Sequence, residues 1–133
     1  MLTPGHNGCV HNHGGMLENI GATVAINDLL LQSHGGRMRF FPAWNATVLG
    51  AASFSTLRAY GAFLVSGGVD ASGTVGPVTV ESELGGDVVF ESAWAGHAPK
   101  VVSAGATIPT TVVSPRVYSF VSKAGGRYTI SGN

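Results

Sequence analysis

The sequence predicts a mainly β protein, an antiparallel β-sandwich preceded by one N-terminal α-helix. Beyond Gly36, about eight short segments with strand-like alternation are separated by turns rich in Gly, Pro, Asp and Ser, a pattern typical of sandwiches. Before Gly35, apolar residues instead recur with helical spacing. We therefore expect an N-terminal loop and helix over residues 1–34 and a sandwich over residues 35–133.

The N-terminal unit is expected to consist of a polar loop and one amphipathic helix. Residues 1–15 are rich in Gly, His and Asn and predict a loop. The helix is predicted over Glu18 to Gln32, and Gly35-Gly36 should end it, because glycine accepts the left-handed conformation common at helix C-termini. Its apolar positions are Ile20, Val24, Ile26, Leu29, Leu30 and Leu31.

The first strand is expected directly after Gly36, where Met38 and Phe40 alternate with Arg37 and Arg39. A second is expected near Phe54 to Tyr60. The remaining strands are predicted at Ala62–Ser66, Thr74–Ser82, Asp87–Glu91, Lys100–Ser103, Thr110–Val113, Val117–Ser122 and Arg127–Ile130.

Composition excludes several classes of partner. Seven Lys plus Arg balance seven Asp plus Glu, so no electrostatic field favours nucleic acid or an anionic membrane surface. No apolar run approaches the ~18 residues that span a bilayer, and the first residues lack a signal-peptide pattern. The single cysteine, Cys9, allows no internal disulfide. With 44% hydrophobic and 11% charged residues, some apolar surface is expected to be covered by another domain or another copy.

Four sequence blocks, in one order, resemble a known family: Gly21-Ala22-Thr23, the LLLQSH segment at 29–34, the RFFP segment at 39–42 and the LRAYGAF segment at 57–63. Together they are similar to the end of the catalytic barrel and the following β-sandwich of glycoside hydrolase family 95, which includes 1,2-α-L-fucosidases. The resemblance spans roughly residues 14–94. It implies that residues 1–34 resemble the end of an (α/α)6 barrel, that the missing barrel is a partner, and that the parent protein is extracellular or periplasmic.

The resemblance also implies one candidate catalytic residue, Glu18. The family places a catalytic Asp in the loop before the last barrel helix, where this chain has Leu17 followed by Glu18. An inverting glycosidase needs a second carboxyl about 6.5–9.5 Å away. The family takes that group from an earlier barrel helix, so Glu18 could act only with a barrel partner. Alternatively, Glu18 simply stabilises the first helical turn by its interaction with the helix dipole.

We predict no metal site and no cofactor. His11 and His13, with His6 and Glu18 nearby, could place imidazoles on one side of an extended segment, as zinc sites do. The same spacing also arises in a polar loop without a ligand, and the sequence shows no second shell of residues to orient the ligands.

Aromatic residues are candidates for stacking on sugars. We single out Trp44 and Trp94 as candidate carbohydrate-binding residues, with burial in the core as the commoner role of such side chains. The other aromatic candidates are Tyr60, Tyr118 and Tyr128.

The expected function is therefore that of an accessory, structural domain of a family 95-like glycoside hydrolase, not catalytic alone. The alternative is a stand-alone carbohydrate-binding or self-assembling β-sandwich; a complete small enzyme using Glu18 and the histidines has the least support. An exposed apolar helix face would favour the first, and an exposed aromatic row the second. Without its barrel, the helix should drive homo-oligomerisation, and changing Ile26 and Leu30 together to Asp should reduce association while leaving the sandwich folded.

Overall fold

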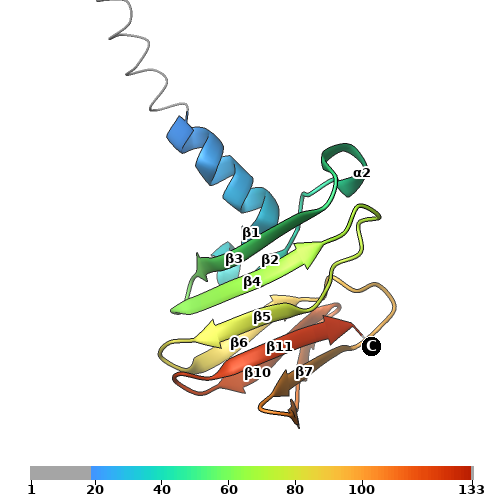
Figure 1. Ribbon diagram of the computed structural model, residues 1–133. Helices are drawn as coiled ribbons and strands as arrows, with labels where there is room; N and C mark the ends of the chain where they lie inside the picture. Colours follow the sequence, from blue (N-terminus) through green and yellow to red (C-terminus); the bar gives the residue numbers. More distant parts are fainter. Residues whose placement is uncertain (1–18, 133) are drawn as a thin grey trace, which may run out of the picture.

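Two sheets packed face to face form the body of the protein, in a computed structural model that describes residues 19–132 (Figure 1). The first sheet has the strand order β1-β2-β6-β10-β9 and the second the order β3-β4-β5-β11-β7-β8. All strand pairs are antiparallel except β2 with β6, which run parallel. The predicted antiparallel sandwich with a preceding helix is thus confirmed as the fold class.

The strands of the first sheet are β1 (Leu31–Gln32), β2 (Met38–Phe40), β6 (Gly86–Glu91), β10 (Val117–Ser122) and β9 (Thr111–Ser114). Those of the second are β3 (Ala52–Ala59), β4 (Phe63–Val69), β5 (Val78–Ser82), β11 (Arg127–Gly132), β7 (Pro99–Ser103) and β8 (Ala106–Ile108). The short elements η1 (His34–Gly36) and α2 (Ala46–Leu49) lie in the connections around β2.

The N-terminal helix projects away from the sandwich and covers residues 19–30 of the described chain (Figure 1). The prediction that it continues to Gln32 is wrong, because Leu31 pairs with Phe40 and Gln32 with Arg39 in the ladder between β1 and β2. Gly35 and Gly36, at φ 75° and 76°, turn the chain between these two strands rather than ending the helix. In the described residues no helix is long and apolar enough to cross a membrane.

Most predicted strands are present, with shifted ends. The strand β10 has the predicted bounds, Val117–Ser122, whereas β5 begins at Val78 instead of Thr74 because residues 70–74 form a turn held by Asp70. Neither α2 nor β8 was expected. The chain enters β8 through Ala104 and Gly105, both with positive φ, as a two-residue hairpin turn of type I′ requires.

The core lies between the two sheets and is built from inward-facing residues of alternating strands. Five valines are fully buried: Val65, Val78, Val80, Val88 and Val101. The Phe90 ring lies at the centre of the aromatic part of this core, with ring centroids 6.1 Å from Phe40, 6.0 Å from Tyr118 and 6.2 Å from Phe120. Burial of each such side chain stabilises the fold by about 1.5–3 kcal/mol.

Candidate functional site

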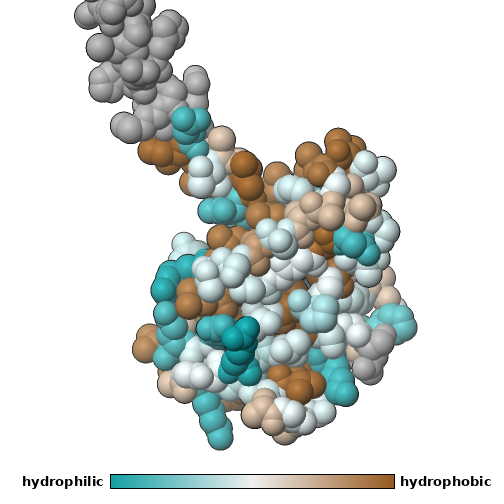
Figure 2. Space-filling view, viewed as in Figure 1, coloured by the Kyte–Doolittle hydropathy of each residue, from teal (hydrophilic) through white to brown (hydrophobic). Residues whose placement is uncertain are grey.

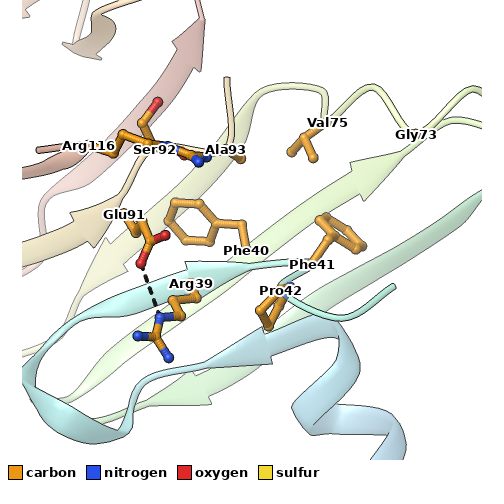
Figure 3. Close-up of a pocket in the computed structure, with 10 residues that line it drawn as sticks. All are labelled: Arg39, Phe40, Phe41, Pro42, Gly73, Val75, Glu91, Ser92, Ala93 and Arg116. Carbon is orange, nitrogen blue, oxygen red and sulfur yellow. Dashed lines mark hydrogen bonds and ion pairs between the residues drawn. The ribbon is translucent and has the colours of Figure 1, made fainter. Parts of the chain in front are cut away.

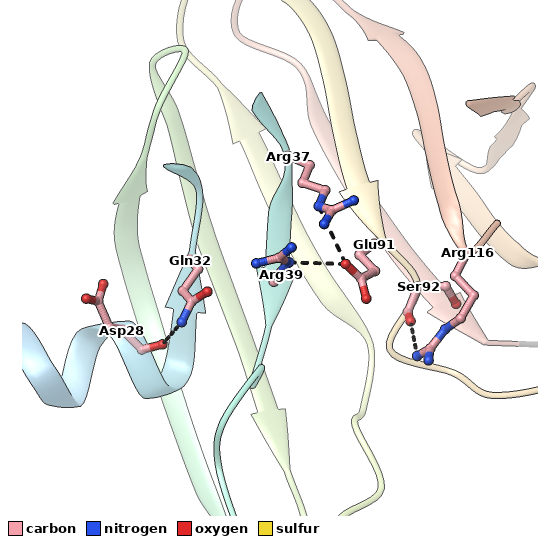
Figure 4. A network of polar contacts seen from close by, with 7 residues as sticks. All are labelled: Asp28, Gln32, Arg37, Arg39, Glu91, Ser92 and Arg116. Carbon is pink, nitrogen blue, oxygen red and sulfur yellow. Dashed lines mark hydrogen bonds and ion pairs between the residues drawn. The ribbon is translucent and has the colours of Figure 1, made fainter. Parts of the chain in front are cut away.

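Positive charge gathers along the first sheet, where two arginines share one carboxylate. Arg39 Nε donates to Glu91 Oε2 at 3.1 Å, and Arg37 Nε lies 3.6 Å from the same oxygen (Figure 4). All three side chains are about one-third exposed, at 34%, 37% and 30% for Arg39, Arg37 and Glu91. The carboxylate therefore neutralises one of the two guanidinium charges and leaves one positive charge in excess. Both guanidinium groups remain accessible to solvent.

The parallel pairing of β2 with β6 places these residues together. Arg39 stands opposite Glu91 in the register, and its neighbours Met38 and Phe40 are buried in the core. Because side chains alternate along a strand, Arg39 is directed to the outer face of the sheet. The apolar residues of β2 thus fix the direction of the arginine between them.

A third arginine, Arg116, is held next to Glu91 by the buried Ser92. Its guanidinium Nη2 donates to the Ser92 carbonyl at 3.0 Å, and its own carbonyl accepts from Ser92 N at 2.7 Å. The Ser92 hydroxyl also donates to the Trp94 carbonyl at 3.2 Å. One serine, 3% exposed, therefore positions both Arg116 and Trp94.

Two hollows meet at Ser92 and Arg116. The first, about 340 Å³, is bordered by Arg39, Glu91 and the apolar side chains of Phe41 and Pro42 (Figure 3). The second, about 350 Å³, is bordered by Trp94, Tyr118 and His97. We call the two together the arginine groove, defined by Arg39, Glu91, Ser92, Trp94, Arg116 and Tyr118. Glu91 lies between Arg39 and the Ser92–Arg116 pair in both close-up views (Figures 3 and 4).

The groove has the chemistry of a binding site for an anion with an apolar body. Among its residues there is one carboxylate, so the pair of carboxyl groups needed for glycoside hydrolysis is absent from it. Within residues 19–132, His, Cys, Asp and Glu side chains nowhere gather in threes in a metal-binding arrangement. The groove therefore brings three kinds of group together, guanidinium groups, one carboxylate and the aromatic rings of Trp94 and Tyr118.

The two tryptophans singled out from the sequence lie apart and are each half-buried. Trp44 donates its indole N–H to the Gly50 carbonyl at 2.9 Å, which closes the loop containing α2. Trp94 donates its indole N–H to the Val75 carbonyl at 2.8 Å and borders the arginine groove. The structure thus brings Trp94 to a candidate site and leaves Trp44 outside it.

Of the remaining predicted site residues, Tyr118 borders the arginine groove with Trp94, and the others lie elsewhere or outside the described part. Tyr128 is buried and accepts a hydrogen bond from Lys123 N at 2.8 Å, Tyr118 stacks on Phe90, and Tyr60 is 77% exposed. These tyrosines therefore do not join the tryptophans in one exposed aromatic row. Outside the described residues lie Glu18, His6, His11 and His13.

The second notable surface is apolar and lies on the helix and α2. Ile20, Val24 and Ile26 on the helix are 57%, 56% and 51% exposed, and Val48 on α2 is 76% exposed. Figure 2 shows apolar surface at this end of the molecule, over the helix and over α2. We call Ile20, Val24 and Ile26 the helix patch; Ile20 and Val24 share one face, whereas Ile26 lies about 160° around the helix from Val24.

Arg39, Glu91 and Arg116 were not singled out from the sequence as functional. Arg39 was expected to alternate with Phe40, but its partner Glu91 lies 52 residues further along the chain. Only the parallel pairing of β2 and β6 brings the two together.

Comparison with protein-family models and with curated proteins finds no match to this chain.

Proposed function

We propose that this chain is a C-terminal accessory domain of a glycoside hydrolase family 95-like protein and is not catalytic alone. In this role the sandwich is a structural module, and the projecting helix docks it to the catalytic barrel. The observation that carries the proposal is the helix patch. Three large aliphatic side chains, more than half exposed, face solvent on a helix that is otherwise joined to a well-packed sandwich.

The energetics support a covered helix. Burying a large aliphatic side chain contributes about 1.5–3 kcal/mol, so a partner that wraps around the helix and covers both Ile20 and Val24 on one face and Ile26 on another would gain several kcal/mol of binding free energy. The last turn of the helix already packs on the sandwich: Leu30 is 8% exposed, and its carbonyl accepts a hydrogen bond from Phe41 N at 2.7 Å. The sandwich therefore holds one end of the helix and leaves the other for a partner.

A second copy of the chain is the alternative partner, supported by the same patch. In that case the chain is a self-assembling sandwich, and its helix pairs with the helix of the other copy. The two candidates differ in stoichiometry, because a barrel would form a complex of unlike subunits and self-assembly would form a homo-oligomer.

The sequence-based test of association requires a different pair of residues. Ile26→Asp with Leu30→Asp was expected to leave the sandwich folded, but Leu30 belongs to the buried core, so its replacement would destabilise the sandwich itself. Ile20→Asn with Ile26→Asn changes exposed positions only. Val121→Asn is the matched control, because Val121 is 71% exposed on β10, a strand of the sandwich rather than the helix.

The experiment combines light scattering with the detection of the native polypeptide. In cells that make the protein, an antibody against the sandwich should detect a polypeptide far larger than 13.6 kDa. The tryptic peptides of that polypeptide should include peptides from an (α/α)6 barrel domain. The purified chain should not hydrolyse 2′-fucosyllactose and should bind the separately produced barrel, more weakly after Ile20→Asn with Ile26→Asn than after Val121→Asn. A native polypeptide without barrel peptides would contradict the accessory role. A homo-oligomer that the double substitution dissociates would then identify self-assembly.

A further inference from the structure

We propose that the arginine groove binds a carboxylated pyranose, that is, a uronic acid unit of a polysaccharide. This inference does not rest on docking through the helix, because Arg39, Arg116 and Trp94 belong to the sandwich and none of them is in the helix patch. Its failure would therefore leave the accessory role unaffected.

The first argument is the local excess of positive charge. Elsewhere in the described chain the arginines are paired one to one: Arg58 with Glu83, in a bidentate pair at 2.6 and 3.2 Å, and Arg127 with Glu81 at 3.3 Å. At the groove, Arg39 shares the single carboxylate of Glu91 with Arg37, which lies beside the groove. No carboxylate of residues 19–132 forms an ion pair with Arg116. In a chain with zero formal net charge, this concentration of guanidinium groups favours an anion at one place.

The second argument is that Arg116 is held in place before any ligand arrives. Its backbone has φ 67°, in the two-residue loop Pro115-Arg116 between β9 and β10, a position that usually requires glycine when proline precedes it. The two hydrogen bonds with the buried Ser92 hold it in this strained conformation. Strain of this kind is concentrated at ligand-binding positions, and a fixed guanidinium loses little freedom when it binds a carboxylate.

The third argument concerns the body of the ligand. Arg116 borders both hollows, and the apolar surface lies in the second, where Trp94 and Tyr118 border it; the surface of the first hollow is mostly polar, because Phe41 is buried in the core. A pyranose has apolar faces that pack on such side chains and hydroxyl groups that need polar partners, and its carboxylate can accept two parallel hydrogen bonds from one guanidinium. A uronic acid therefore satisfies the charge and the apolar borders of the groove together.

Titration of the full chain with trigalacturonate, followed by amide and indole NMR signals, tests the proposal. The signals of Ser92, Trp94 and Arg116 should shift saturably, and the shifts should weaken as salt is added. The fully methyl-esterified trisaccharide keeps the rings without the charge, and acetate supplies the carboxylate without the rings. Equal binding of either control, or no saturation by ligand on the order of 10 mM, would overturn the proposal.

Three variants separate binding from folding. Arg116→Gly places glycine at the positive φ, so it should keep the fold and weaken trigalacturonate binding about tenfold. Glu91→Gln removes the competing carboxylate and should strengthen binding, a change that loss of structure could not produce. Arg58→Ala, a matched loss of an arginine outside the groove, should leave binding unchanged. Unchanged binding in a folded Arg116→Gly variant, or weaker binding in a folded Glu91→Gln variant, would contradict the proposed site.

Discussion

The helix and the sandwich use the same kinds of apolar side chain with opposite outcomes. Ile20, Val24 and Ile26 on the helix are more than half exposed, whereas Val80 and Ile130 in the sandwich are fully buried. The strands bury their apolar residues because a second sheet of the same chain faces them. Among residues 19–132, no such layer faces the helix beyond its last turn. The spacing of apolar residues in the sequence therefore predicts which side chains need to be buried. Only the fold shows whether the same chain buries them.

The largest difference between the two regions should appear when a core aromatic is truncated. Phe90→Ala should lower the free energy of unfolding by about 3–5 kcal/mol, because it removes a fully buried ring that packs between Phe40, Tyr118 and Phe120. Urea unfolding measures the loss. Leu84→Ala is the control, since Leu84 is 78% exposed and should change stability by no more than about 0.5 kcal/mol. Similar losses for the two variants would contradict the assigned core.

A smaller effect is expected from the buried polar contact near the Gly85-Gly86 turn. Ser122 Oγ lies 2.9 Å from Ser82 Oγ and donates to the Gly86 carbonyl at 2.7 Å. Ser122→Ala removes the hydroxyl that both groups contact, although Ser82 Oγ still accepts from Gly85 N at 3.0 Å, and should cost about 1–2 kcal/mol of unfolding free energy. The exposed Ser53→Ala serves as the reference in the same urea measurement. A Ser122→Ala variant as stable as the reference would show that water replaces the hydroxyl.

The helix patch should contribute almost nothing to the stability of the isolated monomer. Ile20→Asn with Ile26→Asn should alter the unfolding free energy by no more than about 0.5 kcal/mol per site, since neither side chain is buried. Hydrogen exchange gives a second measurement: amides of residues 20–27 should exchange much faster than that of Ile130, because a helix is marginal where tertiary packing does not support it. A loss well above 1 kcal/mol, measured at concentrations where the chain is monomeric, would mean that the helix packs on its own sandwich.

The sequence predicted the fold where local pattern and tertiary structure agree. The alternation over Val117–Ser122 and the turn glycines predicted β10 with its bounds, because each side chain's face follows from the strand period. The helix end was misplaced because Leu29, Leu30 and Leu31 continue the helical spacing, and only pairing of Leu31 with Phe40 across the η1 turn makes that segment a strand. The missed α2 is a single turn, too short for a periodic pattern.

The candidate site was less accessible to prediction than the fold. Trp94 was identified from its residue type, but its position beside Arg116 depends on hydrogen bonds that both residues make with Ser92. The ion pair of Arg39 and Glu91 depends on a parallel pairing within a chain whose other strands are antiparallel. A single sequence carries no local signal for either arrangement.

The smallest expected effect concerns the turn after β4. Like the helix, this turn is exposed, but hydrogen bonds to a side chain stabilise it. Asp70 Oδ1 accepts from Ser72 Oγ at 2.6 Å and from the backbone N–H groups of Ser72 and Thr74, each at 2.9 Å. The Ser72 hydroxyl, followed by the Thr74 amide, lowers the pKa of the Asp70 carboxyl below its ordinary value of 3.8. Because the folded-state pKa is the lower one, this contribution to stability is complete above pH 3.8 and is lost as the pH falls from there through the folded pKa. An NMR titration of the Asp70 carboxyl carbon should show the lowered pKa, and Ser72→Ala should raise it toward 3.8. An unchanged Asp70 pKa in the Ser72→Ala variant would show that the backbone amides alone hold the turn.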